Sequence, residues 1–324
     1  MPQSPVAQTP VVQTRILLGV VWRDSEPYVR LRDDESPAST LVPAAGLRLN
    51  YRLTGEPSRQ CVGHVPFRSA NADGQRSDYH DCTRRPQQGS RTCERCGIVE
   101  ATFASNLHHA HTRGTAELDP AIVEHLQQPN RLYLAGFRDG SIKVGTSTLS
   151  RTQKRLEEQG AWMARLVAEM TNGIAVRSLE DLVTEVWSLP QAVNARRKIK
   201  GLVDPLPDAE LDRLLGAAAR DVGRLMDRAP DDRVLPLAMG EDPGERWRHP
   251  MAEHPALAKV LAYPLTLQSG NHDLEVITAV GRALLVRRSS GDDVFAIDPA
   301  PLFGLRLDMG DYGSDEIAIQ DSLF

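Results

Sequence analysis

The sequence predicts an α+β protein in which a small sheet-plus-helices core is flanked by β-rich regions. Strand-like runs concentrate near residues 15–55 and 263–298, whereas helical periodicity concentrates in residues 150–228. All four cysteines lie between residues 61 and 96. A chain of 324 residues that is 41 % hydrophobic is long enough for two or three compact units.

The first 116 residues predict a β-rich region that includes the cysteine-rich segment. Strands are expected in the runs RILLGVVW, PYVRLR and GLRLNYRL, with turns in DSEP, DDESPAS and TGEPS. Residues 1–14 lack the charged start and the apolar stretch of a signal peptide, and we expect a disordered tail there. The β-rich region is therefore expected to span residues 15–116.

The cysteine spacing predicts a structural zinc site. Cys93 and Cys96 form a CxxC pair, which allows two thiolates to bind one tetrahedral ion. Cys61 and Cys82 would complete a four-cysteine site without an open coordination position. The other interpretation is four reduced thiols without a shared role. A polar segment of this kind usually needs a metal to stay ordered, and we therefore expect Zn²⁺ here.

Histidines near this segment are weaker metal candidates. His64 and His80 are reserve ligands for the cysteine site. The HHAH motif of His108, His109 and His111 suggests a second metal, but adjacent histidines in a polar linker usually reflect exposure to solvent.

The central residues 117–228 predict a hairpin accompanied by helices. A short helix is expected in ELDPAIVEHLQQ, before a hairpin in RLYLAGFRDGSIKVGTS. The run SRTQKRLEEQGAWMARLVAEM is expected to be mostly helical, with a break near Gln159 and Gly160. Ser178 is the expected N-cap of a helix in LEDLVTEVWSL, and a last helix is expected in DAELDRLLGAAARDVGRLMD.

The remaining residues predict a linker and a second β-rich region. Residues 229–250 are rich in Pro and Asp and are expected to be the linker. In residues 251–324, strands are expected in YPLTL, LEVITAVG, RALLVRR and DDVFAID. The end after Arg306 carries five acidic residues and no basic one, which predicts a solvated segment.

The order of four motifs resembles the GIY-YIG nuclease superfamily. The motifs are LYLAGF, IKVGTS, QKRLEEQGA and SLEDLV. The chain is more similar to a bacterial branch of unknown function, in which a cysteine-rich segment precedes a YLA…KVG…R…QGA core. The similarity covers most of the chain, and its most specific part is KVGTS with RLEEQGA. It implies that residues 117–228 form a GIY-YIG-like α+β core.

The resemblance also implies a catalytic set of Tyr133, Lys143, Arg155 and Glu180, with Gly145 as the structural glycine. In the nucleases the glutamate holds a divalent cation, so Mg²⁺ or Mn²⁺ is implied. The arginine stabilises the phosphate, and the tyrosines position or activate water. Lys143 stands where the superfamily has its second tyrosine. It is a further phosphate contact, a general base, or a sign that the reaction was changed or lost.

Each of these residues also has an ordinary structural interpretation. Tyr133 is then a packed strand aromatic, and Gly145 permits a tight turn. Arg155 is then a surface charge on a helix, and Glu180 is favoured in the first turn of its helix by the helix dipole.

Two basic segments predict local contacts with nucleic acid, because a net charge of −5 gives no general basic surface. The first is equally compatible with a solvated polar loop, and a run such as the second usually forms a solvated face. The first segment surrounds the cysteines and the second follows the Glu180 helix; they comprise Arg84, Arg85, Arg91 and Arg95, and Arg196, Arg197 and Lys198.

The expected function is that of a metal-dependent nuclease-like protein that acts on DNA or RNA phosphodiesters. One alternative is a catalytically inactive nucleic-acid-binding protein. Another is an enzyme that acts on a small molecule with the same scaffold. No apolar run approaches the ~20 residues of a membrane span, so we expect no membrane contact and a cytoplasmic location.

Overall fold

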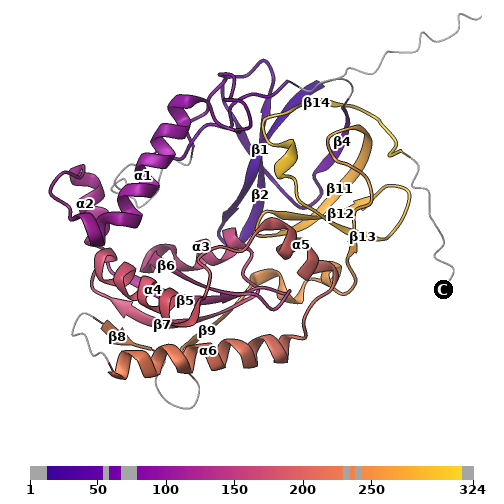
Figure 1. Ribbon diagram of the computed structural model, residues 1–324. Coiled ribbons are helices and arrows are strands. Elements are labelled where there is room, and N and C mark those ends of the chain that lie inside the picture. The colour runs from indigo at the N-terminus through magenta and orange to yellow at the C-terminus, as the bar shows by residue number, and fades with distance from the viewer. Residues whose placement is uncertain (1–12, 54–57, 67–78, 229–233, 238–242, 316–324) are drawn as a thin grey trace, which may run out of the picture.

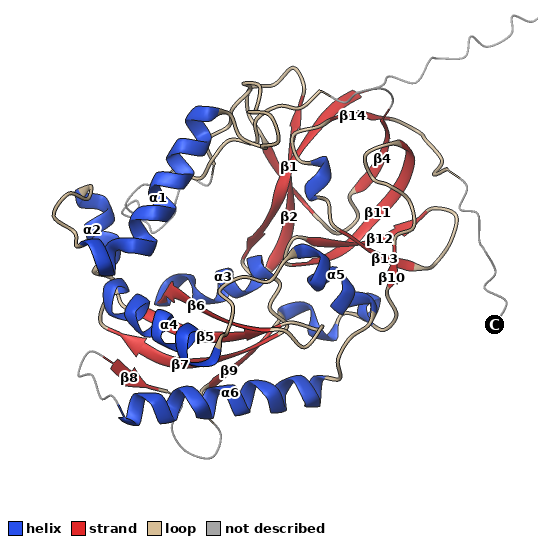
Figure 2. Ribbon diagram, viewed as in Figure 1, coloured by secondary structure: helices blue, strands red, loops and turns tan. Residues whose placement is uncertain are grey.

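The computed structural model describes residues 13–53, 58–66, 79–228, 234–237 and 243–315. Two sheets form the body of the protein, and most of the helices lie around the smaller one (Figures 1 and 2). This architecture confirms the predicted α+β class. The described residues contain no helix that is both long enough and apolar enough to cross a membrane.

The larger sheet has nine strands in the order β10-β13-β12-β11-β4-β14-β1-β2-β3. It combines strands from both ends of the chain, so the two predicted β-rich regions share one sheet. The N-terminal strands are β1 (Gln13–Arg23), β2 (Glu26–Asp33), β3 (Thr40–Pro43) and β4 (Arg48–Leu53). The C-terminal strands are β10 (Leu261–Ala262), β11 (Gly270–Val280), β12 (Ala283–Arg288), β13 (Val294–Ile297) and β14 (Arg306–Met309).

Strand β14 corrects the expectation of a solvated end after Arg306. It lies between β4 and β1, with Met309 opposite Gln13 and Asp308 opposite Arg52, and Leu307 is fully buried. Four residues that include an aspartate carry too short a pattern to predict a strand, and only the neighbouring strands define this one. The predicted strand YPLTL is also wrong, because β10 ends before it, and β3 was not predicted.

The smaller sheet contains β5 (Asn130–Gly136), β6 (Ile142–Thr148) and β7 (Met163–Met170) in the order β6-β5-β7. The predicted hairpin is confirmed in β5 and β6. Strand β7 also pairs with β8 (Val234–Pro236) and β9 (Glu245–Arg248), which lie in the segment predicted to be a linker.

Strand β7 was predicted to be helical, and this prediction is wrong. An apolar run of this length is compatible with a buried strand and with a buried helix, and periodicity does not separate the two. Residues of β7 are buried on both faces of the sheet, because Leu166 and Val167 contact different apolar clusters. Pairing with β5 on one side and with β8 and β9 on the other decides the conformation.

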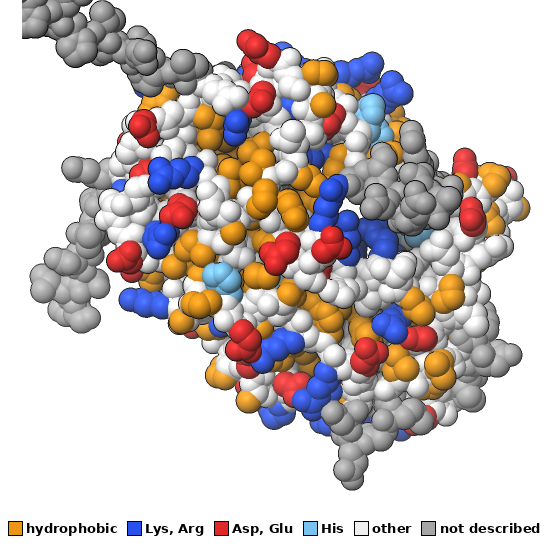
Figure 3. Space-filling view, turned by 180° about the vertical axis from the view of Figure 1, so that it is seen from behind, with side chains coloured by type: hydrophobic (Ala, Val, Ile, Leu, Met, Phe, Trp, Pro, Cys, Tyr) orange, Lys and Arg blue, Asp and Glu red, His pale blue; other side chains and the backbone are white. Residues whose placement is uncertain are grey.

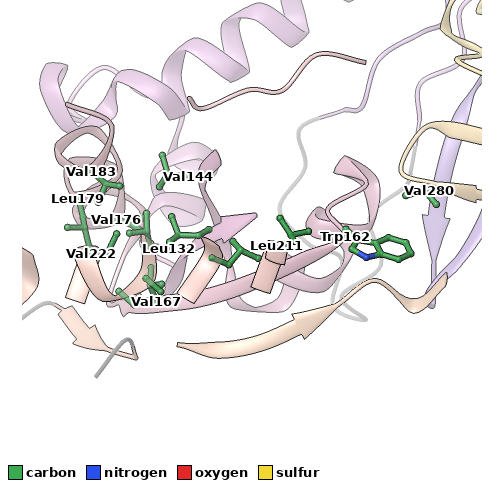
Figure 4. Close-up of a cluster of buried hydrophobic side chains, with 14 of the residues drawn as sticks. Leu132, Val144, Trp162, Val167, Val176, Leu179, Val183, Leu211, Val222 and Val280 are labelled. Carbon is green, nitrogen blue, oxygen red and sulfur yellow. The ribbon is translucent and has the colours of Figure 1, made fainter. Parts of the chain in front are cut away.

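Helices cover the smaller sheet and extend away from it as an arm. The arm contains α1 (Glu94–Arg113) and α2 (Pro120–Leu126), and Figure 1 shows it at one side of the molecule. The helices at the smaller sheet are α3 (Thr152–Gln159), α4 (Gly173–Trp187) and α6 (Asp208–Arg228), whereas α5 (Ala195–Val203) packs against β10, β12 and β13 of the larger sheet. Figure 4 shows Leu132, Val144 and Val167 of the sheet beside Val176 of α4 and Leu211 of α6, in one apolar layer.

The two sheets contact each other through well-defined polar and close-packed groups. The Ser25 hydroxyl, in the turn after β1, donates to Glu157 of α3 at 2.8 Å. A Cβ atom on Gly281 would lie 2.6 Å from the backbone nitrogen of Gly160, so the turns that carry these two glycines touch. The core site described below therefore lies against the larger sheet.

Candidate functional site

Tyr133 and Gly145 lie opposite each other in the β5–β6 hairpin. Tyr133 is fully buried, and its phenol oxygen accepts a hydrogen bond from Nε2 of Gln159 at 2.8 Å. A Cβ atom on Gly145 would lie 2.6 Å from that oxygen and 2.7 Å from the ring carbon that bears it. Gly145 therefore leaves room for the phenol in the middle of a strand, rather than permitting a tight turn.

Lys143 precedes Gly145 by two residues and shares its face of β6. Its side chain is buried, and Nζ donates to the Gln191 carbonyl at 3.3 Å. Burial, together with the positive charges of Arg155 and Lys198, lowers the pKa of Lys143 to about 8, although Glu180 acts in the opposite direction. A lysine in this state exchanges its proton close to neutral pH.

Glu180 lies on α4 and is almost completely buried, with 2 % of its surface exposed. Its carboxylate accepts from the guanidinium of Arg177 at 2.5 Å. The predicted start of this helix at Ser178 is wrong, because α4 begins five residues earlier, at Gly173. Asn172 is the N-cap and accepts from the backbone nitrogens of Ile174 and Ala175, so Glu180 does not lie in the first turn.

Arg155 lies on α3 with an exposed side chain. It interacts with Tyr133: burial raises the pKa of the Tyr133 phenol, whereas Arg155 and Gln159 limit that rise. The negative charge of Glu180 acts on Tyr133 in the same direction as burial. Four positions predicted from motifs in different parts of the sequence therefore lie within electrostatic reach of one another.

Arg155 also lines an open pocket of about 470 Å³ between the core and the helical arm, whereas Tyr133, Lys143 and Glu180 do not line it. Three arginines line it: Arg151, Arg155 and Arg177. Polar groups of β6 and histidines of the arm also line it, namely Thr146, Ser147, Thr148, His108 and His125, together with the apolar Ala104, Leu107 and Leu126. Figure 3 shows Lys and Arg side chains gathered at the edge of a hollow on the rear face of the molecule. Such a lining favours an anionic ligand.

The four cysteines lie together and are all buried. Their sulfur atoms lie within 4.8 Å of one another, and Sγ of Cys82 is 3.8 Å from Sγ of Cys93. Four Zn–S bonds of about 2.3 Å in a tetrahedron place the sulfurs about 3.8 Å apart, so the donor set matches a metal such as zinc. Backbone nitrogens of Gly63 and Cys93 donate to Sγ of Cys61, as expected for a thiolate.

The histidines take other positions. His64 lies outside the sulfur donors, with Nδ1 3.3 Å from Sγ of Cys96, and it pairs with His80 in an isolated β-bridge. The HHAH motif lies on α1 rather than in a linker, and Nε2 of His111 contacts the Asp181 carboxylate at 2.8 Å. Among the described residues, the four cysteines are the one group of this kind that could hold a metal ion.

One residue of each predicted basic segment, Arg91 and Lys198, lines the same small pocket. Arg84, Arg85, Arg91 and Arg95 of the cysteine segment are exposed, as are Arg196 and Arg197 of α5. Arg197 is paired with Asp139 at 2.8 Å. Lys198 donates to the Gln159 carbonyl at 2.7 Å, and a pocket of about 180 Å³ is lined by Lys198, Arg91 and Arg282 together. Gln159 therefore connects this smaller pocket to the Tyr133 phenol.

Sequence reasoning missed Gln159, Gln191, Arg151 and Arg177. Gln159 and Arg155 are one helical turn apart, so the helix periodicity of α3 could have indicated that they share a face. Arg177 lies three residues before Glu180, and the wrong helix start concealed that pairing. No local pattern indicates Gln191, because its contact with Lys143 spans 48 residues.

The fold and its sites define an α+β protein with a four-cysteine centre that could bind a metal and a cation-lined core pocket. A family model described as a protein of unknown function, DUF2797, matches residues 59–272, and the chain belongs to this family. No curated protein and no solved structure matches the chain. The family description names no activity and does not mention the GIY-YIG superfamily, so that resemblance stays a prediction.

Proposed function

We propose that the protein binds nucleic acid and that the pocket beside Tyr133 is a nuclease-like site for a phosphodiester. One observation carries the proposal: the charges of Arg155 and Glu180 act on both Tyr133 and Lys143, and Arg155 also lines a pocket with two further arginines. These are the positions that the resemblance to GIY-YIG nucleases implies. Phosphodiester cleavage needs positive charge around the phosphoryl oxygens, and the arginines supply it.

The proposed phosphate contacts are the guanidinium groups of Arg151, Arg155 and Arg177. A guanidinium donates two parallel hydrogen bonds to a phosphate, which orients it as well as attracting it. Hydroxyl groups of Ser147 and Thr146 line the same pocket and are suitable donors to the remaining oxygens.

Lys143 is the proposed general base. With a pKa of about 8, roughly a tenth of the side chains are neutral at pH 7, and a neutral amine accepts a proton from an attacking water. The Tyr133 phenol, with its raised pKa, stays protonated and positions groups by hydrogen bonding. Arg155 would offset the charge that develops on the phosphate oxygens.

The residues of this site fit an anion better than a divalent cation. Glu180 is the one carboxylate among the described groups whose charge acts on Lys143, and it is paired with Arg177. Three cations act on Lys143 in addition, so we assign no step to Mg²⁺ or Mn²⁺. The cysteine centre differs, and we propose Zn²⁺ there with a structural role because all four donors are protein side chains.

The test combines binding and cleavage on single-stranded and duplex DNA and RNA, with EDTA, Mg²⁺ or Mn²⁺. Arg155→Gln is expected to weaken binding roughly fivefold, and Lys143→Met to lower the cleavage rate about 100-fold or more. Arg220→Gln is the matched control, because Arg220 is an exposed arginine on α6, away from the pocket. Absence of binding by the wild type at low salt would contradict the proposal.

A non-catalytic nucleic-acid-binding protein is the second candidate. The ion pair between Arg177 and Glu180 favours this function. Glu180 stands where the GIY-YIG nucleases have the glutamate that binds the divalent cation, and here its carboxylate already accepts a hydrogen bond from Arg177. This function predicts strand binding that weakens steeply with salt, no cleavage with any cation, and unchanged binding in Glu180→Gln.

A further inference from the structure

We propose a second phosphate-binding groove, between the cysteine segment and the C-terminal end of the larger sheet, that holds a single nucleic-acid strand leading to the Tyr133 site. The inference rests on the proposed nucleic-acid function and names the path of the strand. The groove has a volume of about 780 Å³, and its walls come from residues 58–60, 83–91 and 301–306. Arg59 and Leu305 pair in an isolated β-bridge, so two of these segments lie side by side next to the start of β14.

The charge of the groove is one-sided. Four arginines line it, Arg59, Arg85, Arg91 and Arg306, and no described residue of its lining is acidic. Arg306 forms an ion pair with Asp34 at 2.8 Å. Arg59 instead donates to two backbone carbonyls, those of Pro301 at 2.9 Å and of Phe303, which carry no charge to offset that of its guanidinium. Arg59 and Arg91 also lie near enough for Arg91 to lower the pKa of Arg59, in addition to the effect of burial. An anion in the groove would relieve this repulsion.

The remaining lining suits a nucleic-acid strand. Gln87, Gln88, Ser90 and Thr83 present amides and hydroxyls, which donate to phosphate oxygens and to base edges. The loop that carries them is ordered by its own hydrogen bonds: the Gln87 nitrogen donates to the Thr92 carbonyl, and the Ser90 nitrogen donates to the Gln87 carbonyl, both at 3.0 Å.

The cysteine centre holds one wall of the groove. The backbone nitrogen of Cys61 donates to the Arg84 carbonyl at 2.8 Å, and that of Val62 donates to the Arg91 carbonyl at 3.0 Å. Both bonds join the segment that carries Cys61 to the loop that carries the arginines. A metal at the cysteines would therefore fix the spacing of the groove.

Arg91 joins the groove to the core site. It lines both the groove and the smaller pocket that also contains Lys198 and Gln159. Gln159 in turn donates to the Tyr133 phenol. That smaller pocket has about 180 Å³ and mixed charge, since Glu158 and Asp298 line it as well. This volume is smaller than the ~300 Å³ of the smallest pockets that bind drug-sized ligands. The pocket therefore has room for part of a single strand but not for a duplex.

The experiment measures fluorescence anisotropy with labelled single strands from about 4 to about 16 nucleotides and with duplexes of equal length. For the wild type, affinity is expected to rise with strand length until the strand spans the groove and the core site. The double variant Arg85→Gln/Arg91→Gln is expected to weaken binding of the longest strand about tenfold and to lower the slope of log affinity against log salt concentration by about 2. Its affinity should also stop rising at a shorter strand length than that of the wild type. Arg220→Gln should leave all three unchanged.

Metal content and thermal melting of each variant verify that the cysteine segment remains folded. If the double variant binds every length as the wild type does, while Arg155→Gln weakens binding, the groove is refuted and the core site stands. If the wild type binds no strand, both proposals fail. Equal affinity for a mononucleotide and a long strand, or preference for duplex, would also refute a single-strand path.

Discussion

The cysteine centre and the core pocket have opposite donor chemistry. The first gathers four buried sulfur atoms, which as thiolates favour a soft cation. The second gathers Lys143, Arg155 and Arg177 around a single buried carboxylate, which favours an anion. We therefore expect the proposed metal and the proposed phosphate to bind in different regions of this molecule rather than at one shared site.

The two regions also differ in what holds them together. The cysteine segment has few apolar contacts of its own beyond the sulfur cluster, whereas the core pocket stands on a sheet packed against α4 and α6. A metal is therefore expected to stabilise the first region and to have little effect on the second. The predictions below test this comparison, from the largest expected effect to the smallest.

Cys93→Ser is expected to have the largest effect. It removes one of four donors, so we expect the loss of about one metal ion per chain and of hydrogen-exchange protection in residues 79–96. Protection in β5, β6 and β7 should remain. Elemental analysis and hydrogen exchange provide the measurements, and His64→Ala is the control that should keep its metal. Equal loss of protection in both regions would remove the distinction between them.

Gly145→Ala tests the core by packing alone. The new Cβ would overlap the Tyr133 phenol, and we expect the free energy of unfolding to fall by about 2–3 kcal/mol. Adding Tyr133→Leu should recover part of the loss, which urea denaturation of the four proteins of this cycle would measure. Gly19→Ala is the control, because a Cβ there meets nothing within 4 Å. Metal content should be unchanged in every variant.

Lys143 gives the core site a pH dependence. The pKa of Lys143 is about 8 in the folded protein and 10.5 in the unfolded chain. Between pH 8 and pH 10.5 the unfolded chain therefore binds more protons than the folded protein. Stability should therefore rise with pH across this window, by about 3 kcal/mol for this residue, and the cost should be fully present below pH 8. Lys143→Met should be more stable at pH 7 and should lack this contribution.

Urea unfolding at several pH values would measure the difference between the wild type and Lys143→Met, which separates Lys143 from other titrating groups. The exposed Lys259 provides the control variant Lys259→Met. A difference that does not change between pH 7 and pH 10.5 would contradict the buried charged amine.

Arg177→Gln should have the smallest effect. It leaves the buried Glu180 carboxylate without its charge partner, and we expect a loss of about 1–2 kcal/mol because Arg177 itself is partly exposed. Glu180→Gln in the same chain should recover most of it. Arg213→Gln is the control, because Arg213 and Glu210 are also three residues apart but lie at the surface, where solvent screens the pair and its removal should change stability little. Urea denaturation of each variant would measure the loss of unfolding free energy and so compare the Arg177–Glu180 pair with the Arg213–Glu210 pair.

Local sequence patterns predicted much of the fold and part of the candidate site. The hairpin of β5 and β6 was predicted because alternating residues and a turn are encoded within seventeen positions. The four cysteines were predicted as a group because their spacing limits how they can be arranged. The pairing of Arg177 with Glu180 was missed through a wrong helix start, since Asn172 rather than Ser178 caps α4.

The sequence by itself determined the α+β class, the hairpin with its glycine, and the four-cysteine group, because each depends on residue type and spacing along the chain. The tertiary structure decided that residues 163–170 form a strand, that residues 306–309 enter the larger sheet, and that Gln159 reaches Tyr133. It also brought Arg91 beside Lys198. These features depend on hydrogen-bonding and packing partners far away in the chain, which local periodicity does not encode.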